Sequence, residues 1–205
     1  MTGRSRLVLG AGVAVAVAAL AGMDRWATHS LTGHMLQHVV LMTVAAPLVA
    51  LGLPWAAGRA WVLWLTAGIV LQSAAMIGWH LSAPFDAALR HDPVHGIEHL
   101  TLLGTAVLFW WAVLAASRTK IAAGVVAVFL ASLACTAIGV PLVLAGKPWY
   151  LGYRSLADQQ LAGVIMWALA GAVYVVSGAA LFFTWLAGVE RRSPARLVPA
   201  EGSTT

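Results

Sequence analysis

Charged residues are scarce in this 205-residue chain, where Asp, Glu, Lys and Arg together make up 9% of the sequence. Soluble domains carry roughly 25% charged residues. Hydrophobic residues make up 61%, and the mean hydropathy is +0.87. This balance excludes an ordinary soluble protein and indicates a polytopic membrane protein with room for one helical bundle.

Cysteine is nearly absent, since Cys135 is the only one in the chain. A single cysteine excludes an internal disulfide and a multi-cysteine metal motif, and in an apolar run it is expected to pack as a small hydrophobe. Acidic residues are also few, and the formal net charge is +5. The twelve Lys and Arg are scattered over the connecting segments without forming a stripe, so the expected partner is the lipid bilayer and not nucleic acid.

Six apolar runs are long enough to cross a bilayer, and they predict an all-α transmembrane bundle of about six spans. The runs cover residues 7–23, 31–53, 60–81, 92–116, 121–145 and 159–186. The first also resembles a signal peptide, but a cut after residue 18 would leave apolar residues behind, so a retained helix is expected. Residues 82–92 are too short and polar to cross, which predicts a surface turn or short interfacial helix.

Proline and glycine predict irregularities inside two of these spans. Pro47 predicts a kink in the second span, and Gly139 with Pro141 predicts an interruption of the fifth. We expect three parts along the chain: an N-terminal span and its connection over residues 1–28, a His-rich transmembrane bundle over 29–187, and a cytoplasmic disordered tail over 188–205.

The distribution of basic residues predicts the orientation of the bundle. With six spans, eight Lys and Arg fall on the side of the two termini and four on the other side. The positive-inside rule then places both termini in the cytoplasm. All seven histidines fall at the extracytoplasmic ends of the spans: His29, His34, His38, His80, His91, His95 and His99.

Two pentads, HMLQH at residues 34–38 and HGIEH at 95–99, each hold a histidine pair four residues apart. On a helix this spacing puts both imidazoles on one face, about one turn apart, where two nitrogens can reach one metal ion. Ionisable residues within membrane helices are costly unless they serve a polar site. We therefore predict a metal site formed by His34, His38, His80, His95 and His99.

Other polar and soft residues lie near these histidines in the sequence. Gln37 and Glu98 are suited to hold a ring N–H of a ligating imidazole. Met42 and Met76 lie one turn deeper than His38 and His80, and imidazole with thioether favours copper(I); Met166 is a similar candidate, although methionine is commonly core filler. Asp158 is expected to cap its own helix or to supply a carboxylate to the cavity. Residues 147–158 are expected to form a loop with aromatic residues at interfacial depth.

Two other kinds of site also use histidines in such patterns. The second pentad matches the H-x-x-E-H arrangement of some zinc peptidases, but Gln37 in the first pentad cannot act as a base, and no enzymatic activity is expected. Histidines on two helices could instead hold a b-type haem from opposite faces of the macrocycle.

Several motifs in order resemble those of the CtaG-type cytochrome c oxidase assembly proteins. They are GHMLQH at 33–38, AP at 46–47, LGLP at 51–54, WHL at 79–81, PFDAAL at 84–89, HGIEH at 95–99, FWW at 109–111, DQQLAG at 158–163 and MW at 166–167. The resemblance covers roughly residues 30 to 187. It implies a multi-pass protein of the bacterial plasma membrane that helps to form active haem–copper oxidase.

Together these observations predict an assembly factor that binds copper in an extracytoplasmic cup of five histidines and exchanges it with a partner. The expected partners are haem–copper oxidase subunits or a copper chaperone. The alternatives are a scaffold in the same pathway whose histidines form a protonatable network, a haem-binding protein, or a copper transporter that would use Gln72 and Thr136 in the cytoplasmic half.

Overall fold

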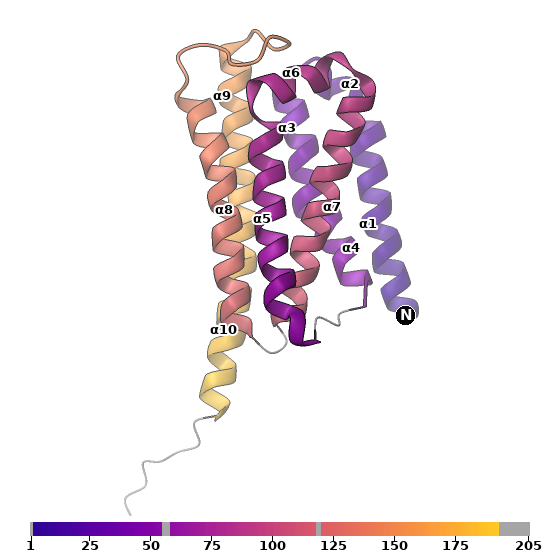
Figure 1. The fold of residues 1–205 in the computed structure, drawn as a ribbon, viewed down its shortest axis with the longest axis vertical. Helices are drawn as coiled ribbons and strands as arrows, with labels where there is room; N and C mark the ends of the chain where they lie inside the picture. The colour runs from indigo at the N-terminus through magenta and orange to yellow at the C-terminus, as the bar shows by residue number, and fades with distance from the viewer. Residues whose placement is uncertain (1, 55–57, 118–119, 193–205) are drawn as a thin grey trace, which may run out of the picture.

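The computed structural model describes residues 2–54, 58–117 and 120–192, and within these ranges the chain forms helices and no strand (Figure 1). Six helices are long and apolar enough to cross a membrane, which confirms the predicted all-α transmembrane bundle. They are Gly3–Gly22, Leu31–Gly52, Gly58–Trp79, Asp92–Ser117, Ile121–Leu144 and Leu156–Glu190. These six helices lie side by side with their long axes nearly aligned.

The first span, α1 (Gly3–Gly22), packs along α4 (Ala46–Gly52) through glycines. A Cβ atom at Gly52 would lie 2.6 Å from the Cβ of Leu9, and one at Gly12 would lie 2.6 Å from the backbone nitrogen of Val49. Small residues of this kind allow membrane helices to approach closely, because lipid provides no hydrophobic force between them. The N-terminal helix is therefore part of the bundle.

Two spans contain a π-helical turn. The second span runs through α3 (Leu31–Val40), the π turn η1 (Leu41–Ala45) and α4. The irregularity predicted from Pro47 thus takes the form of a widened turn just before the proline, which cannot donate a hydrogen bond to the preceding turn. The sixth span has the same design, with α9 (Leu156–Val164), the π turn η3 (Ile165–Leu169) and α10 (Ala170–Arg192).

The third, fourth and fifth spans contain no π turn within the described residues. They are the turn η2 (Gly58–Ala60) with α5 (Trp61–Trp79), α7 (Asp92–Ser117) and α8 (Ile121–Leu144). The predicted interruption of the fifth span is wrong, because α8 continues through Gly139 and Pro141. Pro141 lies in the last turn, where its missing N–H affects only one backbone hydrogen bond.

Short elements cover one end of the bundle. The helices α2 (Asp24–Ala27) and α6 (Ser82–Arg90) lie at the end opposite to the N-terminus, together with the loop before α9 (Figure 1). The helix α6 confirms the predicted short helix over residues 82–92. At the other end α10 continues past the predicted end at residue 186, so residues 188–192 of the tail predicted over 188–205 are helical, and residues 193–205 lie outside the described residues.

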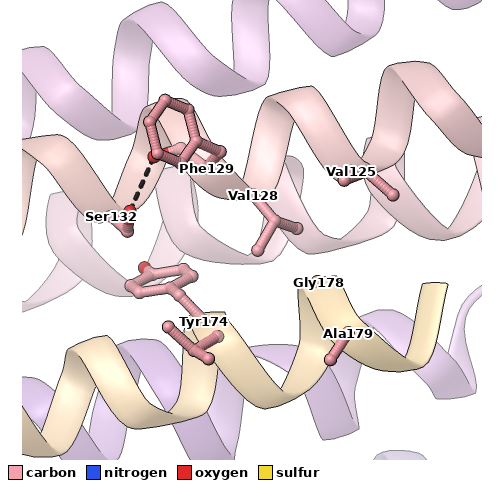
Figure 2. A pocket seen from close by; sticks show the side chains of 8 residues that line it. Val125, Val128, Phe129, Ser132, Tyr174, Gly178 and Ala179 are labelled. Atoms are coloured by element: carbon pink, nitrogen blue, oxygen red, sulfur yellow. Dashed lines mark hydrogen bonds between the residues drawn. The ribbon is translucent and has the colours of Figure 1, made fainter. Parts of the chain in front are cut away.

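Aromatic side chains join the middle of the bundle. The rings of Trp110 and Tyr174 stack with their centroids 5.7 Å apart, and Trp110 Nε1 donates to the carbonyl of Met42 at 2.9 Å. Tyr174 also borders an apolar groove of about 170 Å³ between α8 and α10 (Figure 2). The hydroxyl of Ser132 in this groove donates to Phe129 of its own helix. No predicted site residue lines the groove, so the candidate site lies elsewhere.

Candidate metal centre

The first turn of α3 positions His34. The side chains of Ser30 and Asp158 cap this turn. Ser30 Oγ accepts from the N–H of Gly33 at 3.2 Å, the usual N-cap arrangement. The carboxylate of Asp158 accepts from Ser30 Oγ at 2.9 Å, from Leu31 N at 2.7 Å and from Thr32 N at 3.2 Å. A residue of α9 thus fixes the start of α3.

This contact corrects the expectation that Asp158 caps its own helix. The N-cap of α9 is Ser155, whose hydroxyl accepts from the N–H of Asp158 at 3.2 Å. Both carboxylate oxygens of Asp158 bond to the first turn of α3 instead, because an N-terminus with free N–H groups attracts a carboxylate from any direction. Asp158 therefore orients the element that carries two of the histidines.

The five predicted histidines come together from three helices. Their ring centroids are separated by 4.5 Å for His34 and His38, 5.3 Å for His34 and His95, 4.3 Å for His95 and His99, 5.2 Å for His38 and His99, and 5.5 Å for His38 and His80. His34, His38, His80 and His99 are buried, and His95 is partly buried. We refer to these five residues with Glu98 as the histidine cluster.

Glu98 of the second pentad faces the two histidines of the first pentad. Its side chain is fully buried, and its carboxylate oxygens lie 3.7 Å from Nε2 of His34 and from Nε2 of His38. These separations are longer than hydrogen bonds. Two sets of potential metal ligands overlap here, each with ligand atoms within 4.8 Å of one another: His34, His38 and His99, and His34, His95 and Glu98.

The cluster contains nearly all the unpaired buried polar atoms of the described residues. Eight buried side-chain nitrogen and oxygen atoms have no hydrogen-bond partner, and seven of them belong to the cluster. These seven are Nε2 of His34, Nδ1 and Nε2 of His38, Nε2 of His95, Nε2 of His99 and both carboxylate oxygens of Glu98. Native proteins rarely leave such atoms unpaired, so this set fits a bound cation.

His80 has a defined orientation at the end of α5. Its Nδ1 lies 2.7 Å from the carbonyl oxygen of Met76, and its own carbonyl accepts from the hydroxyl of Tyr150 at 2.8 Å. Burial lowers the pKa of His80 from the usual 6.5 to about 4, so the ring is neutral at neutral pH. The ring is therefore available as a metal ligand.

Aromatic residues from α6 and from the loop between α8 and α9 close the cluster from outside. Phe85 packs against His34 with a centroid separation of 4.9 Å, and Tyr150 packs against Phe85 at 4.1 Å. The hydroxyl of Tyr153 donates to the carbonyl of Ala27 and lies 3.4 Å from Nδ1 of His34. Burial raises the pKa of both tyrosines well above the ordinary value near 10. These side chains shield the imidazoles from water.

Sequence reasoning missed three of these contacts. Tyr150 and Tyr153 were expected only at interfacial depth, and Met35 was not among the candidates, although it lies inside the first pentad. The sulfur of Met35 is 3.2 Å from Nε2 of His80. The presence of a methionine between two candidate ligands was a signal that could have identified it.

Gln37 does not hold a ring N–H, which corrects the prediction for this residue. Its amide nitrogen donates to the carbonyl of Ala19 at 3.0 Å and also lies 3.4 Å from that of Leu20, both on α1. One residue of difference turns a side chain by about 100° around a helix, so Gln37 faces away from His38. Gln37 joins the first two spans.

The three predicted methionines are all buried. The sulfur of Met42 accepts from Nε2 of Gln72 at 3.2 Å, and Met76 contacts His80 through its backbone carbonyl. Met166 packs in the main hydrophobic core from the π turn η3. His29 and His91 are exposed and lie outside the cluster.

Six apolar helices with a buried group of imidazoles and a carboxylate at one end define a polytopic membrane protein with a candidate metal centre. Residues 3–188 match the family model of the cytochrome c oxidase caa3 assembly factor, CtaG. The chain belongs to this family of cytochrome c oxidase assembly factors, which confirms the resemblance in the sequence motifs. No individual curated protein and no solved structure matches it.

Proposed function

We propose that this assembly factor binds a copper ion in the histidine cluster on the extracytoplasmic side of the bacterial plasma membrane. It passes the ion to an oxidase subunit or a copper chaperone by ligand exchange. The observation that carries the proposal is the group of seven unpaired buried nitrogen and oxygen atoms on five neighbouring side chains. Burying so many lone pairs without hydrogen bonds destabilises a protein, and one cation would compensate most of them at once.

The ligand chemistry favours copper among the metals that imidazole binds. Divalent copper lies at the top of the affinity order for nitrogen and oxygen ligands, and monovalent copper accepts imidazole and thioether. Both ligand types are present, since the sulfur of Met35 lies beside His80. A Ca²⁺ or Mg²⁺ site would instead need a shell of oxygen atoms, and Glu98 is the only carboxylate in the two ligand sets.

Overlap between the two ligand sets suits release as well as binding. His34 belongs to both sets, so it can hold the ion while either His38 with His99 or His95 with Glu98 exchanges places with an incoming ligand. Ion transfer of this kind forms and breaks only coordination bonds. The proposed role therefore needs binding and exchange and no enzymatic step.

The contacts within the cluster support copper over haem. A haem held by two histidines lies between their rings, with one imidazole on each face of the macrocycle. In this cluster the rings pack directly on one another, at 4.5 Å for His34 and His38 and 5.3 Å for His34 and His95. No macrocycle fits between rings in such contact.

Copper(I) titration of the purified protein against a chelator tests the proposal. Wild type should bind copper stoichiometrically, and His34→Ala and His95→Ala should weaken binding by at least about 10- to 100-fold, the loss seen even for outer-shell partners of metal ligands. His29→Ala is the control, because His29 is exposed and bonds the backbone of Arg25. Absence of stoichiometric binding, or binding that neither cluster variant changes, would refute the metal site and leave a scaffold role.

A further inference from the structure

The position of the hydrogen on His80 follows from its surroundings. Nδ1 lies 2.7 Å from the carbonyl oxygen of Met76. A carbonyl oxygen can only accept, so Nδ1 must carry the hydrogen of this bond. In a neutral imidazole the other nitrogen, Nε2, then presents a lone pair.

This lone pair faces another lone-pair donor. Nε2 of His80 lies 3.2 Å from the sulfur of Met35, and a thioether has no hydrogen to donate. The ring cannot easily turn away, because its Nδ1 is bonded to the carbonyl oxygen of Met76 and Phe85 packs near it with a centroid separation of 6.1 Å. A cation that binds both is the simplest group to stabilise this contact.

We propose that Met35 and His80 form a mixed nitrogen–sulfur position for a soft monovalent metal ion, with His38 as an adjoining third ligand. This inference rests on the proposed function. It adds that the position formed by Met35 and His80 selects copper in its monovalent state. An ion bonded at about 2.0 Å to nitrogen and about 2.3 Å to sulfur, the distances typical of zinc in proteins, would place these donors 3.2 Å apart at roughly a right angle.

His38 is suited to complete this position. Its ring packs against that of His80 with centroids 5.5 Å apart, its side chain is fully buried, and both of its nitrogens lack a partner. Thioether sulfur binds copper(I) well and zinc poorly. The cluster then offers a softer position at Met35 and His80 and a harder one at His34, His95 and Glu98.

Met42 is a buried methionine whose sulfur accepts an ordinary hydrogen bond, and it serves as a comparison for Met35. Its sulfur accepts from Nε2 of Gln72 at 3.2 Å, and Thr105 donates to the amide oxygen of Gln72 at 2.8 Å, which sets the direction of that amide. The sulfur of Met42 therefore faces a true N–H donor. Met35 differs from Met42 in facing a lone pair, and Met42 is the matched control.

Metal titration and X-ray absorption of the loaded protein test the inference. The substitution Met35→Leu keeps the side-chain volume nearly constant. It should weaken copper(I) and silver(I) binding by about 10-fold or more, the scale of effects seen around metal ligands, and leave zinc(II) binding unchanged. The X-ray absorption spectrum of copper-loaded wild type should show a sulfur atom bonded to copper. This sulfur signal should disappear in Met35→Leu and remain in Met42→Leu.

Two outcomes would overturn the inference while the proposed function stands. One is copper(I) binding that depends on His34 but shows no sulfur neighbour in wild type. The other is an unchanged copper(I) affinity in a folded Met35→Leu protein. Selenomethionine-labelled wild type, in which a selenium neighbour should replace sulfur, tests thioether ligation without any substitution. If wild type binds no copper(I) at all, the proposed function fails as well.

Discussion

At the scale of single residues, the position of Glu98 favours metal binding and lowers the stability of the metal-free protein. Its buried carboxylate lies 3.7 Å from two imidazole nitrogens and makes no hydrogen bond. An unsatisfied buried polar group destabilises the folded state by about 1–3 kcal/mol, and more when it is charged. Residues kept in such positions are typical of functional sites.

Replacing Glu98 with glutamine should therefore have opposite effects on stability and on metal binding. The amide can donate to the nearby lone pairs of His34 or His38, so the metal-free protein should gain about 1 kcal/mol or more. Copper affinity should fall, because the carboxylate ligand is lost. Thermal unfolding and chelator competition measure the two effects, with Glu190→Gln on the exposed end of α10 as control. A variant that binds copper as tightly as wild type would remove Glu98 from the ligand set.

At the scale of elements, the position of the first pentad depends on a contact with the last span. Asp158 on α9 accepts three hydrogen bonds from the first turn of α3, and the hydroxyl of Thr32 donates back to the carbonyl of Asp158 at 3.1 Å. Gly163 and Gly139 hold α9 close to α8, since a Cβ atom on Gly163 would lie 2.7 Å from the carbonyl oxygen of Gly139. The sixth span thus positions α3 although it provides no residue to the histidine cluster.

The substitution Asp158→Ala should lower the stability of the metal-free protein by about 1–3 kcal/mol, because it leaves several donors of α3 without their acceptor. It should also weaken copper binding, since His34 lies in the turn that loses its cap. Asp158→Asn keeps one acceptor oxygen and should be intermediate. Thermal unfolding and copper titration provide the measurements.

The matched control for this contact is Ser155→Ala, which removes only the N-cap of α9 itself. It should reduce stability without a comparable loss of copper affinity. Equal effects of Ser155→Ala and Asp158→Ala on copper binding would show that the contact between α9 and α3 has no special role in orienting His34.

At the scale of the whole molecule, all seven histidines belong to one end of the bundle. They lie at the start of α3, the end of α5, the start of α7 and the segments next to α2 and α6, all of which meet at that end (Figure 1). The sequence count assigns eight basic residues to the side of the two termini and four to the side of the histidines. A bundle with this polarity should present the cluster outside the cytoplasm.

Labelling of single cysteines in a Cys135→Ser background tests this orientation. In intact cells, a membrane-impermeant maleimide should label Lys147→Cys, at the end of the cluster, and should not label Lys120→Cys at the opposite end. Both lysines are exposed, so accessibility alone does not separate them. The reverse pattern would place the cluster on the cytoplasmic side and exclude delivery from outside, while the copper titration would still stand.

The sequence by itself determined the number and approximate positions of the spans and the pairing of histidines within each pentad. Both properties are local, since a helix of given length and hydropathy crosses the bilayer and residues four apart share its face. The tertiary structure alone decided which side chains meet. Helix rotation and packing turn Gln37 toward α1, bring Asp158 to α3 and place Met35 against His80. Those contacts join residues from 18 to 127 positions apart, and periodicity along one helix contains no information about the partner helix.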